Sequence, residues 1–358
     1  MHRFVALTAA ALLAGVVLAS TLAFSGTSGV ATTDPILVGV GDIADDNSSK
    51  LGDNRTAQLI QNQWPEATVF ANGDLAYETG TLAQFDTYYH DNSSSTAFAW
   101  GESLNDQIKP VPGNHEYGTS NADGYFAYFG QQGVPVGDGP ANARGYYYYD
   151  LGTNWRVIAL NTGNQSVVPF SSTSIQYAWL EARLKEANAE GKNVMAYFHL
   201  PLYSSGFEHG WRKSTSTNKL ACSAPSVQAV KPLWNLLYRY GADLIVQAHD
   251  HSYERLVPIT AEGTTTDANG AGTRPNPILS FVVGSGGNNL KPNGDKYPTD
   301  FNGDCGPLRP QSAKFLYNKF GVLALTLHAS SYDYQYVQTT NGTDAIVADA
   351  GVAVPVNP

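Results

Sequence analysis

The sequence predicts an α/β fold, because short apolar runs with the length of buried strands alternate along the chain with segments of helical periodicity. The first run, residues 35–40, is followed by a helical segment that starts at Asp53 and by a second strand over residues 67–71. A strand, a helix and a strand in this order are typical of two neighbouring parallel strands joined by a crossover helix. With 42% hydrophobic and 15% charged residues, the 358-residue chain has the composition of a folded globular protein.

The alternation continues along the rest of the chain. Further helices are predicted over residues 82–90, 175–188 and 225–240. Further strands are predicted over residues 108–112, 194–198 and 243–248, and a hairpin is predicted over residues 146–160. The tyrosines of that hairpin are expected to be structural. The runs over residues 278–283 and 322–327 are expected to be strands of a second sheet without chemistry at their ends.

The N-terminus has the pattern of an export signal. A short basic start, Met1-His2-Arg3, precedes an almost wholly apolar stretch over residues 4–24 and small residues over 25–28. A retained transmembrane anchor is the alternative, since about 20 apolar residues can span a bilayer. We expect residues 1–31 to be a signal peptide and linker, residues 32–358 to form a single domain, and the protein to be secreted, periplasmic or extracellular without a membrane attachment after cleavage.

Charge and cysteine content narrow the possible partners. The formal net charge is -10, and no run of Lys and Arg provides the basic patch expected of a nucleic-acid-binding surface. Cys222 and Cys305 are the two cysteines of the chain. In an exported protein a lone pair is expected to form a disulfide rather than a metal or catalytic site.

Side chains that can bind metal ions follow five of the predicted strands. They are Asp42, Asp74, Tyr77, Asn114, His199, His249 and His251. Because ligands gather outside the carboxyl ends of strands in open α/β sheets, we expect these side chains to face one crevice. Seven candidates exceed the four ligands of a single tetrahedral ion, and a carboxylate such as Asp74 can bridge two ions. The sequence therefore favours two metal ions.

Two such ions would suit a phosphate ester as substrate. His249 and His251 lie two residues apart on an extended segment, which projects both imidazoles to the same side and lets each serve one ion. Two ions about 4 Å apart can hold a phosphate oxygen, lower the pKa of a bound water, and stabilise the attacking and leaving oxygens of a displacement. Most of these motifs alone are more typical of a turn or of a buried histidine, and His249-x-His251 is the stronger signal. Their joint occurrence at successive strand ends indicates a metal centre.

In this order, the motifs resemble those of the calcineurin-like metallophosphoesterases, and specifically of the purple acid phosphatase branch. The matching residues are Gly41-Asp42, Gly73-Asp74-x-x-Tyr77, Gly113-Asn114-His115-Glu116, His199 and His249-x-His251-x-Tyr253-Glu254-Arg255. Tyr77 points to the purple acid phosphatases, since most other members of the superfamily lack this tyrosine. The resemblance implies a four-layer α/β/β/α sandwich of two mixed sheets flanked by helices. It also implies that residues 32–358 form the catalytic domain, without the N-terminal β-sandwich domain of many plant-type relatives.

The resemblance also implies a role for each site residue. The ferric ion, Fe(III), would be held by Asp42, Asp74, Tyr77 and His251, and a divalent ion, Zn, Mn or Fe(II), by Asp74, Asn114, His199 and His249. Asp74 would bridge the two ions. His115 would contact the phosphate or protonate the leaving group, and His209 would be a second histidine on the substrate side. Ala44 and Ala248 depart from the family pattern, in which glycine is usual at both positions.

The function implied by the resemblance is that of an exported dimetal phosphoesterase. It would hydrolyse phosphate monoesters of small phosphorylated substrates by attack of a metal-bound hydroxide. Two alternatives remain open at this point. The chain could be a phosphodiesterase or nucleotidase of the same fold, or a secreted metal-binding protein without turnover.

Overall fold

The computed structural model describes residues 34–46, 52–90, 98–137, 145–206, 212–213, 220–221, 228–265, 277–288 and 311–357. Residues from Asp34 onward form one compact unit. The expected signal segment, the two cysteines with their expected disulfide, and His209 lie outside the described residues. Within the described ranges, no helix is both long and apolar enough to cross a membrane.

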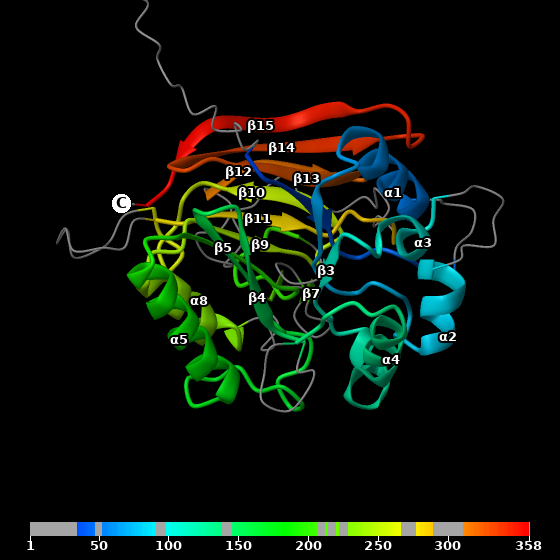
Figure 1. Ribbon diagram of the computed structural model, residues 1–358, viewed down its shortest axis with the longest axis horizontal. Coiled ribbons are helices and arrows are strands. Elements are labelled where there is room, and N and C mark those ends of the chain that lie inside the picture. Colours follow the sequence, from blue (N-terminus) through cyan, green and yellow to red (C-terminus); the bar gives the residue numbers. More distant parts are fainter. Residues whose placement is uncertain are drawn as a thin grey trace, which may run out of the picture. The chain divides into compact units, whose positions relative to one another are not determined.

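One sheet has six strands in the order β15-β14-β13-β1-β2-β3. Figure 1 shows β15, β14 and β13 of this sheet side by side. Its strands are β1 (Ile36–Val40), β2 (Thr68–Ala71), β3 (Ile108–Pro110), β13 (Phe320–Leu327), β14 (Ser331–Thr339) and β15 (Ile346–Pro355). The neighbours β1, β2 and β3 are parallel, with Val40 opposite Ala71 and Ala71 opposite Pro110. The carboxyl ends of these three strands therefore lie at one edge of the sheet, whereas β13, β14 and β15 complete it with antiparallel pairs.

The second sheet has seven strands in the order β12-β10-β11-β9-β6-β5-β4. Its strands are β4 (Tyr147–Leu151), β5 (Trp155–Ala159), β6 (Asn193–Tyr197), β9 (Leu244–Gln247), β10 (Ser252–Leu256), β11 (Leu279–Val283) and β12 (Ser312–Tyr317). The hairpin predicted over residues 146–160 is β4 and β5, which pair antiparallel. Strands β5, β6, β9 and β11 are parallel neighbours. The two-residue strands β7 (Arg212–Lys213) and β8 (Leu220–Ala221) pair separately.

The expectation that residues 278–283 and 322–327 share a second sheet is wrong. β11 lies beside β9 in the seven-stranded sheet, whereas β13 pairs with β1 in the six-stranded sheet. Both strands therefore lie next to strands that carry predicted ligands. Strands that are buried on both faces are continuous apolar runs, so their sequence contains little information on which partner strand they choose.

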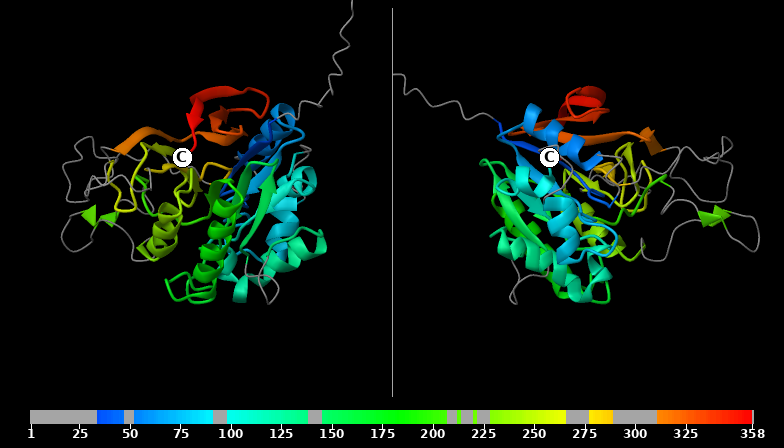
Figure 2. Two further views of the ribbon diagram at one scale, coloured as in Figure 1. Left: turned by 60° about the vertical axis from the view of Figure 1, so that its left-hand side comes forward. Right: turned by 90° about the vertical axis from the view of Figure 1, so that its right-hand side faces the viewer.

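The helices cover the outer faces of the two sheets. They are α1 (Gly52–Gln63), α2 (Leu82–Gln84) with a π-helical continuation over Phe85–His90, α3 (Trp100–Leu104), α4 (Asp123–Gln131), α5 (Ile175–Ala189) and α8 (Lys231–Arg239). In Figure 2, α5 and α8 lie on one side of the strands, and the helices from α1 to α4 lie on the other side. The α5 helix begins where the Ser174 hydroxyl accepts a hydrogen bond from the Tyr177 amide, as an N-cap residue does.

Strand β6 shows how the layers share the core. Met195 and Tyr197 belong to the core cluster that also contains residues of β1 and β2, whereas Val194 and Ala196 pack with α5 and α8. Successive side chains of a strand point to opposite faces, so β6 is covered by the other sheet on one side and by helices on the other. The predicted four-layer α/β/β/α sandwich is confirmed.

Candidate metal centre

The predicted ligands follow strands of both sheets. Asp42, Asp74 and Asn114 come after β1, β2 and β3 of the six-stranded sheet, and His199 and His249 come after β6 and β9 of the seven-stranded sheet. Backbone hydrogen bonds join the loops, with the Asp42 amide donating to the Gly73 carbonyl at 3.0 Å and the Ala248 amide donating to the His199 carbonyl at 2.9 Å. The ligands thus converge as expected, but at the edge where two sheets meet.

Four of the side chains form a first cluster around the Tyr77 hydroxyl. This hydroxyl donates to Asp42 Oδ1 at 2.7 Å and lies 3.2 Å from both Asp74 Oδ2 and His251 Nε2. His251 Nε2 is 3.4 Å from Asp42 Oδ1. These are the four side chains that the resemblance assigns to a ferric ion.

A second cluster surrounds His199 Nε2. This atom lies 2.9 Å from His249 Nδ1, 3.0 Å from Asn114 Oδ1 and 3.1 Å from Asp74 Oδ2. The other ring nitrogen, Nδ1, donates to the Asn72 carbonyl at 2.9 Å. Such a bond to a carbonyl fixes the tautomer and leaves Nε2 free to bind a metal.

The chemistry of these donors fits two cations. One nitrogen atom, His199 Nε2, cannot make good hydrogen bonds to three neighbours at once. The carboxylate, amide and imidazole groups that lie within 3.1 Å of this atom are ligands that zinc, manganese and ferrous iron accept. Asp74 Oδ2 is common to both clusters. One ligand atom each from Asp74, His199 and His249 lies within 4.8 Å of the others.

Burial and mutual charge shift the ionisation of these groups. Burial opposes ionisation of Asp74, but the adjacent His199 lowers the pKa of its carboxyl to about 2. Burial also disfavours the charged form of His199, yet Asp74 raises the pKa of the imidazole to about 9. Burial, followed by the charges of Asp42 and Asp74, raises the pKa of the Tyr77 hydroxyl well above its usual value. A cation would reverse the last two shifts, because it favours a neutral imidazole and a phenolate.

His115 borders the clusters without belonging to either. Its amide donates to Asp74 Oδ1 at 2.8 Å, its Nδ1 donates to the Glu78 carbonyl at 2.6 Å, and its Nε2 is 3.8 Å from Asp74 Oδ2. Its side chain is 30% exposed, whereas those of Asp42, Asp74 and His199 are almost fully buried. His115 is therefore placed where a molecule arriving from solvent could contact it.

The loops at the centre have strained backbones and very close approaches. Asp42, Asp74 and His249 have φ values of 61°, 53° and 71°, which are uncommon for residues other than glycine and collect at functional sites. A Cβ atom on Gly113 would lie 2.2 Å from Asp74 Oδ1, so only glycine fits there. Ala44 and Ala248, which stand where glycine is usual in the family, are not among the described residues with positive φ, and alanine is accommodated at both.

Glu116 is a site residue to which the sequence reasoning assigned no role. Its carboxylate is fully buried, and it accepts hydrogen bonds from the amides of Asp74 and Gly113. Burial, followed by the negative charge of Asp74, raises the pKa of Glu116 to about 7, whereas the hydrogen bonds from the Gly113 and Leu75 amides favour its ionised form. Its position directly after Asn114-His115 was the only signal in the sequence, because its partners are backbone groups.

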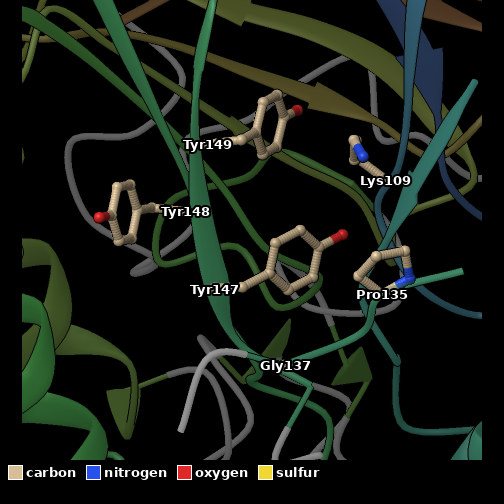
Figure 3. Close-up of a pocket in the computed structure, with 6 residues that line it drawn as sticks. All are labelled: Lys109, Pro135, Gly137, Tyr147, Tyr148 and Tyr149. Atoms are coloured by element: carbon tan, nitrogen blue, oxygen red, sulfur yellow. The ribbon is translucent and has the colours of Figure 1, made fainter.

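A further cavity, of about 370 Å³, lies between β3 and β4 (Figure 3). Lys109, Pro135, Gly137 and the tyrosines of β4 line it. Tyr147 and Tyr149 point toward Lys109 and Pro135, whereas Tyr148 points to the other side of the strand. Among the predicted site residues that the structure describes, none lines this cavity.

Comparison with known proteins identifies the family to which this fold and this set of donors belong. The family model described as calcineurin-like phosphoesterase matches residues 36–253. The match covers more than half of the chain, which therefore belongs to the calcineurin-like phosphoesterase family, in which phosphatases hold two metal ions.

Individual relatives agree with the purple acid phosphatase branch. Purple acid phosphatase 23 of Arabidopsis thaliana is 26% identical over 231 residues, which are 63% of this chain and 43% of that protein. A nucleotide pyrophosphatase/phosphodiesterase of Hordeum vulgare is 25% identical over 81% of this chain and 73% of its own length. The structure of purple acid phosphatase PPD1 from yellow lupin seeds has a TM-score of 0.59 at 20% identity and covers 88% of this chain and 53% of that one. The chain thus spans less than half the length of the Arabidopsis relative.

Proposed function

We propose that this chain hydrolyses phosphate monoesters of small molecules at a centre of two metal ions bridged by Asp74. The observation that supports the proposal is the shared position of Asp74 Oδ2, which lies 3.2 Å from the Tyr77 hydroxyl and 3.1 Å from His199 Nε2. One ion would be held by Asp42, Asp74, Tyr77 and His251. The other would be held by Asp74, Asn114, His199 and His249.

The chemistry of the donors supports a particular choice of ions. A phenolate from Tyr77 with two carboxylates favours Fe(III), a hard cation that can stabilise the deprotonated hydroxyl. An amide, a carboxylate and two imidazoles suit Zn, Mn or Fe(II) at the other position. When bound, the two ions supply Lewis-acid activation of the phosphate and of the attacking water.

His115 would donate the proton that the leaving oxygen requires. Its Nδ1–H is fixed by the Glu78 carbonyl, so in the protonated ring the proton on Nε2 faces the centre. A histidine can both release a proton and regain one from solvent, and the His115 side chain is open to solvent. His209 is proposed as a second proton donor on the sequence pattern alone.

Hydrolysis of diesters or nucleotides is the second candidate. It is favoured by the similarity to the Hordeum vulgare protein, which covers a larger share of this chain than the similarity to the Arabidopsis one. Export by the apolar N-terminal segment over residues 4–24 is part of the proposal. Metal binding without turnover remains the alternative from another class of protein.

A direct assay separates these functions. The metal-loaded protein is tested with p-nitrophenyl phosphate, bis-p-nitrophenyl phosphate and a nucleoside diphosphate from pH 4 to pH 8. Faster hydrolysis of the monoester supports the proposal, and a preference for the second or third compound supports the alternative enzyme. Absence of hydrolysis of all three by protein with both sites filled would leave a metal-binding protein without turnover.

A further inference from the structure

A single buried carboxylate gathers four backbone amides beneath the metal centre. Glu116 Oε2 accepts hydrogen bonds from the amides of Asp74 at 2.9 Å and Gly113 at 2.7 Å. Its Oε1 accepts from the amides of Leu75 at 2.8 Å and Ala76 at 3.3 Å. The side chain has no exposed surface. These four donors leave little of the carboxylate available for any other purpose.

The four amides belong to the two loops that place metal ligands. Three are consecutive, from Asp74 to Ala76, and follow β2, whereas Gly113 follows β3 and directly precedes Asn114. Successive amides beside a residue of left-handed conformation form a concave anion-binding nest, and Asp74 has a φ of 53°. Glu116 is the anion in this nest, and it also ties the nest to the next loop.

The loop that Glu116 binds holds the Asp74 carboxylate in one orientation. The Asp74 backbone is bound by Glu116, and Asp74 Oδ1 accepts from the His115 amide at 2.8 Å. Oδ2 is then directed toward Tyr77 and His199. The bonds from the Asp74, Leu75 and Ala76 amides to Glu116 stabilise the left-handed backbone at Asp74, together with the bond that the Asp74 carbonyl accepts from the Ile43 amide at 2.9 Å.

We propose that Glu116 is a positioning residue that holds Asp74 and Asn114 in the geometry required for two metal ions. The inference rests on the proposed dimetal function and extends it to a residue that touches no ion. A carboxylate is required because all four groups facing it are donors. The amide of glutamine would turn an NH2 group toward two of them and leave buried N–H groups without acceptors.

The test compares zinc affinity in wild-type protein and in Glu116→Gln, with Zn²⁺ alone titrated against a competing chelator after metal removal. Removal of a residue that hydrogen-bonds to a metal ligand typically weakens metal binding about 10- to 100-fold. We expect the zinc affinity of Glu116→Gln to fall by a factor in this range. The kcat for p-nitrophenyl phosphate should decrease by a similar factor with little change in KM, because the phosphate-contacting groups remain. Circular dichroism verifies folding.

Asp243→Asn is the matched control. Asp243 is also buried, and its carboxylate accepts from the amides of Val194 at 2.6 Å and Asn357 at 2.6 Å. It precedes β9, whereas the ligand His249 follows the same strand, so it lies at the opposite end of the sheet from the centre. This variant should lose stability but keep its zinc affinity and kcat within about twofold of the wild type. An equal loss of zinc affinity in both variants would show a general structural effect and overturn the inference.

If Glu116→Gln does not fold, Glu116→Asp carries the test, because it keeps the charge but is one methylene too short to reach all four amides. A folded Glu116→Gln or Glu116→Asp with wild-type zinc affinity and kcat overturns the positioning role and leaves the proposed function intact. If the wild type binds zinc but hydrolyses no ester, the proposed function fails, and weaker zinc binding by the variant still supports the role of Glu116.

Discussion

The Tyr77 hydroxyl donates a hydrogen bond to Asp42 Oδ1 at 2.7 Å, although the two residues are separated by 35 positions in the chain. This contact places a phenol among carboxylates and a histidine, where a ferric ion would convert it to a phenolate. We expect Tyr77→Phe to lose any visible absorption band that the iron-loaded wild type shows and to bind iron about 10- to 100-fold more weakly. The measurement is a visible spectrum at matched iron content.

Tyr125→Phe is the control for this substitution. Tyr125 is also buried, and its hydroxyl donates to the Pro110 carbonyl at 3.0 Å rather than to a candidate ligand. It should lose about 1 kcal/mol of stability and keep the band. A band that persists in Tyr77→Phe contradicts the assignment of Fe(III) to this position.

Asp74 and His115 are expected to act differently on metal binding and on turnover. Asp74→Asn removes the carboxylate that both clusters share, and should abolish activity together with the metal content. His115→Ala should keep both ions and lower kcat about 10²- to 10⁴-fold, which is the usual contribution of a general acid. Metal analysis and kcat are measured on the same preparations. Loss of the ions from His115→Ala would show that His115 is a ligand.

The close approach of Gly113 to Asp74 is expected to tolerate no side chain. A Cβ at Gly113 would lie 2.2 Å from Asp74 Oδ1 and 2.4 Å from the Asp74 amide nitrogen, so Gly113→Ala should lower both stability and metal affinity. At Gly130, within α4, no atom lies within 4 Å of the corresponding Cβ position. Gly130→Ala should therefore raise stability by about 0.5–1 kcal/mol and leave metal binding unchanged. Chemical denaturation and zinc titration of both variants test the pair, and equal behaviour would contradict the steric argument.

The turn between β14 and β15 gives a pH-dependent contribution to stability. Partial burial opposes the charge of Asp344, but hydrogen bonds from Thr339 and Thr340 hold the pKa of its carboxyl well below the usual value. A depressed pKa stabilises the folded state above the unfolded-state pKa of about 4, and this stabilisation is lost as the pH falls toward the folded-state pKa. Asp344→Asn should therefore lower the free energy of unfolding at pH 7, with a difference from wild type that shrinks below about pH 4. A difference independent of pH would refute this origin.

The convergence of the candidate ligands could be predicted because each candidate follows a strand that is short, apolar and easily found in the sequence. Parallel strands that end at one edge bring such residues together regardless of the loops between them. The strands alone could not predict that the candidate ligands come from two sheets, because β11 and β13 are similar apolar runs that pair with strands of different sheets. The resemblance provided the two-sheet architecture.

Other features depended on contacts that the local sequence does not reveal. Glu116 binds backbone amides, which every residue offers, so no spacing of side chains indicated its role. Helix α4 was not predicted, because its many aromatic residues are poor helix formers. It is stabilised by tertiary packing of Tyr125, Tyr128 and Phe129. Strand β15 has mostly exposed or half-buried side chains, and its pairing with β14 comes from the hairpin rather than from an apolar pattern.

The number of metal ions bound per chain tests the central claim most directly. Protein purified without chelators, with its metal content measured by mass spectrometry against protein concentration, should contain two ions per wild-type chain and at most one in Asp74→Asn. One ion or none in fully metal-supplied wild type, or two ions retained by Asp74→Asn, would contradict a centre bridged by Asp74.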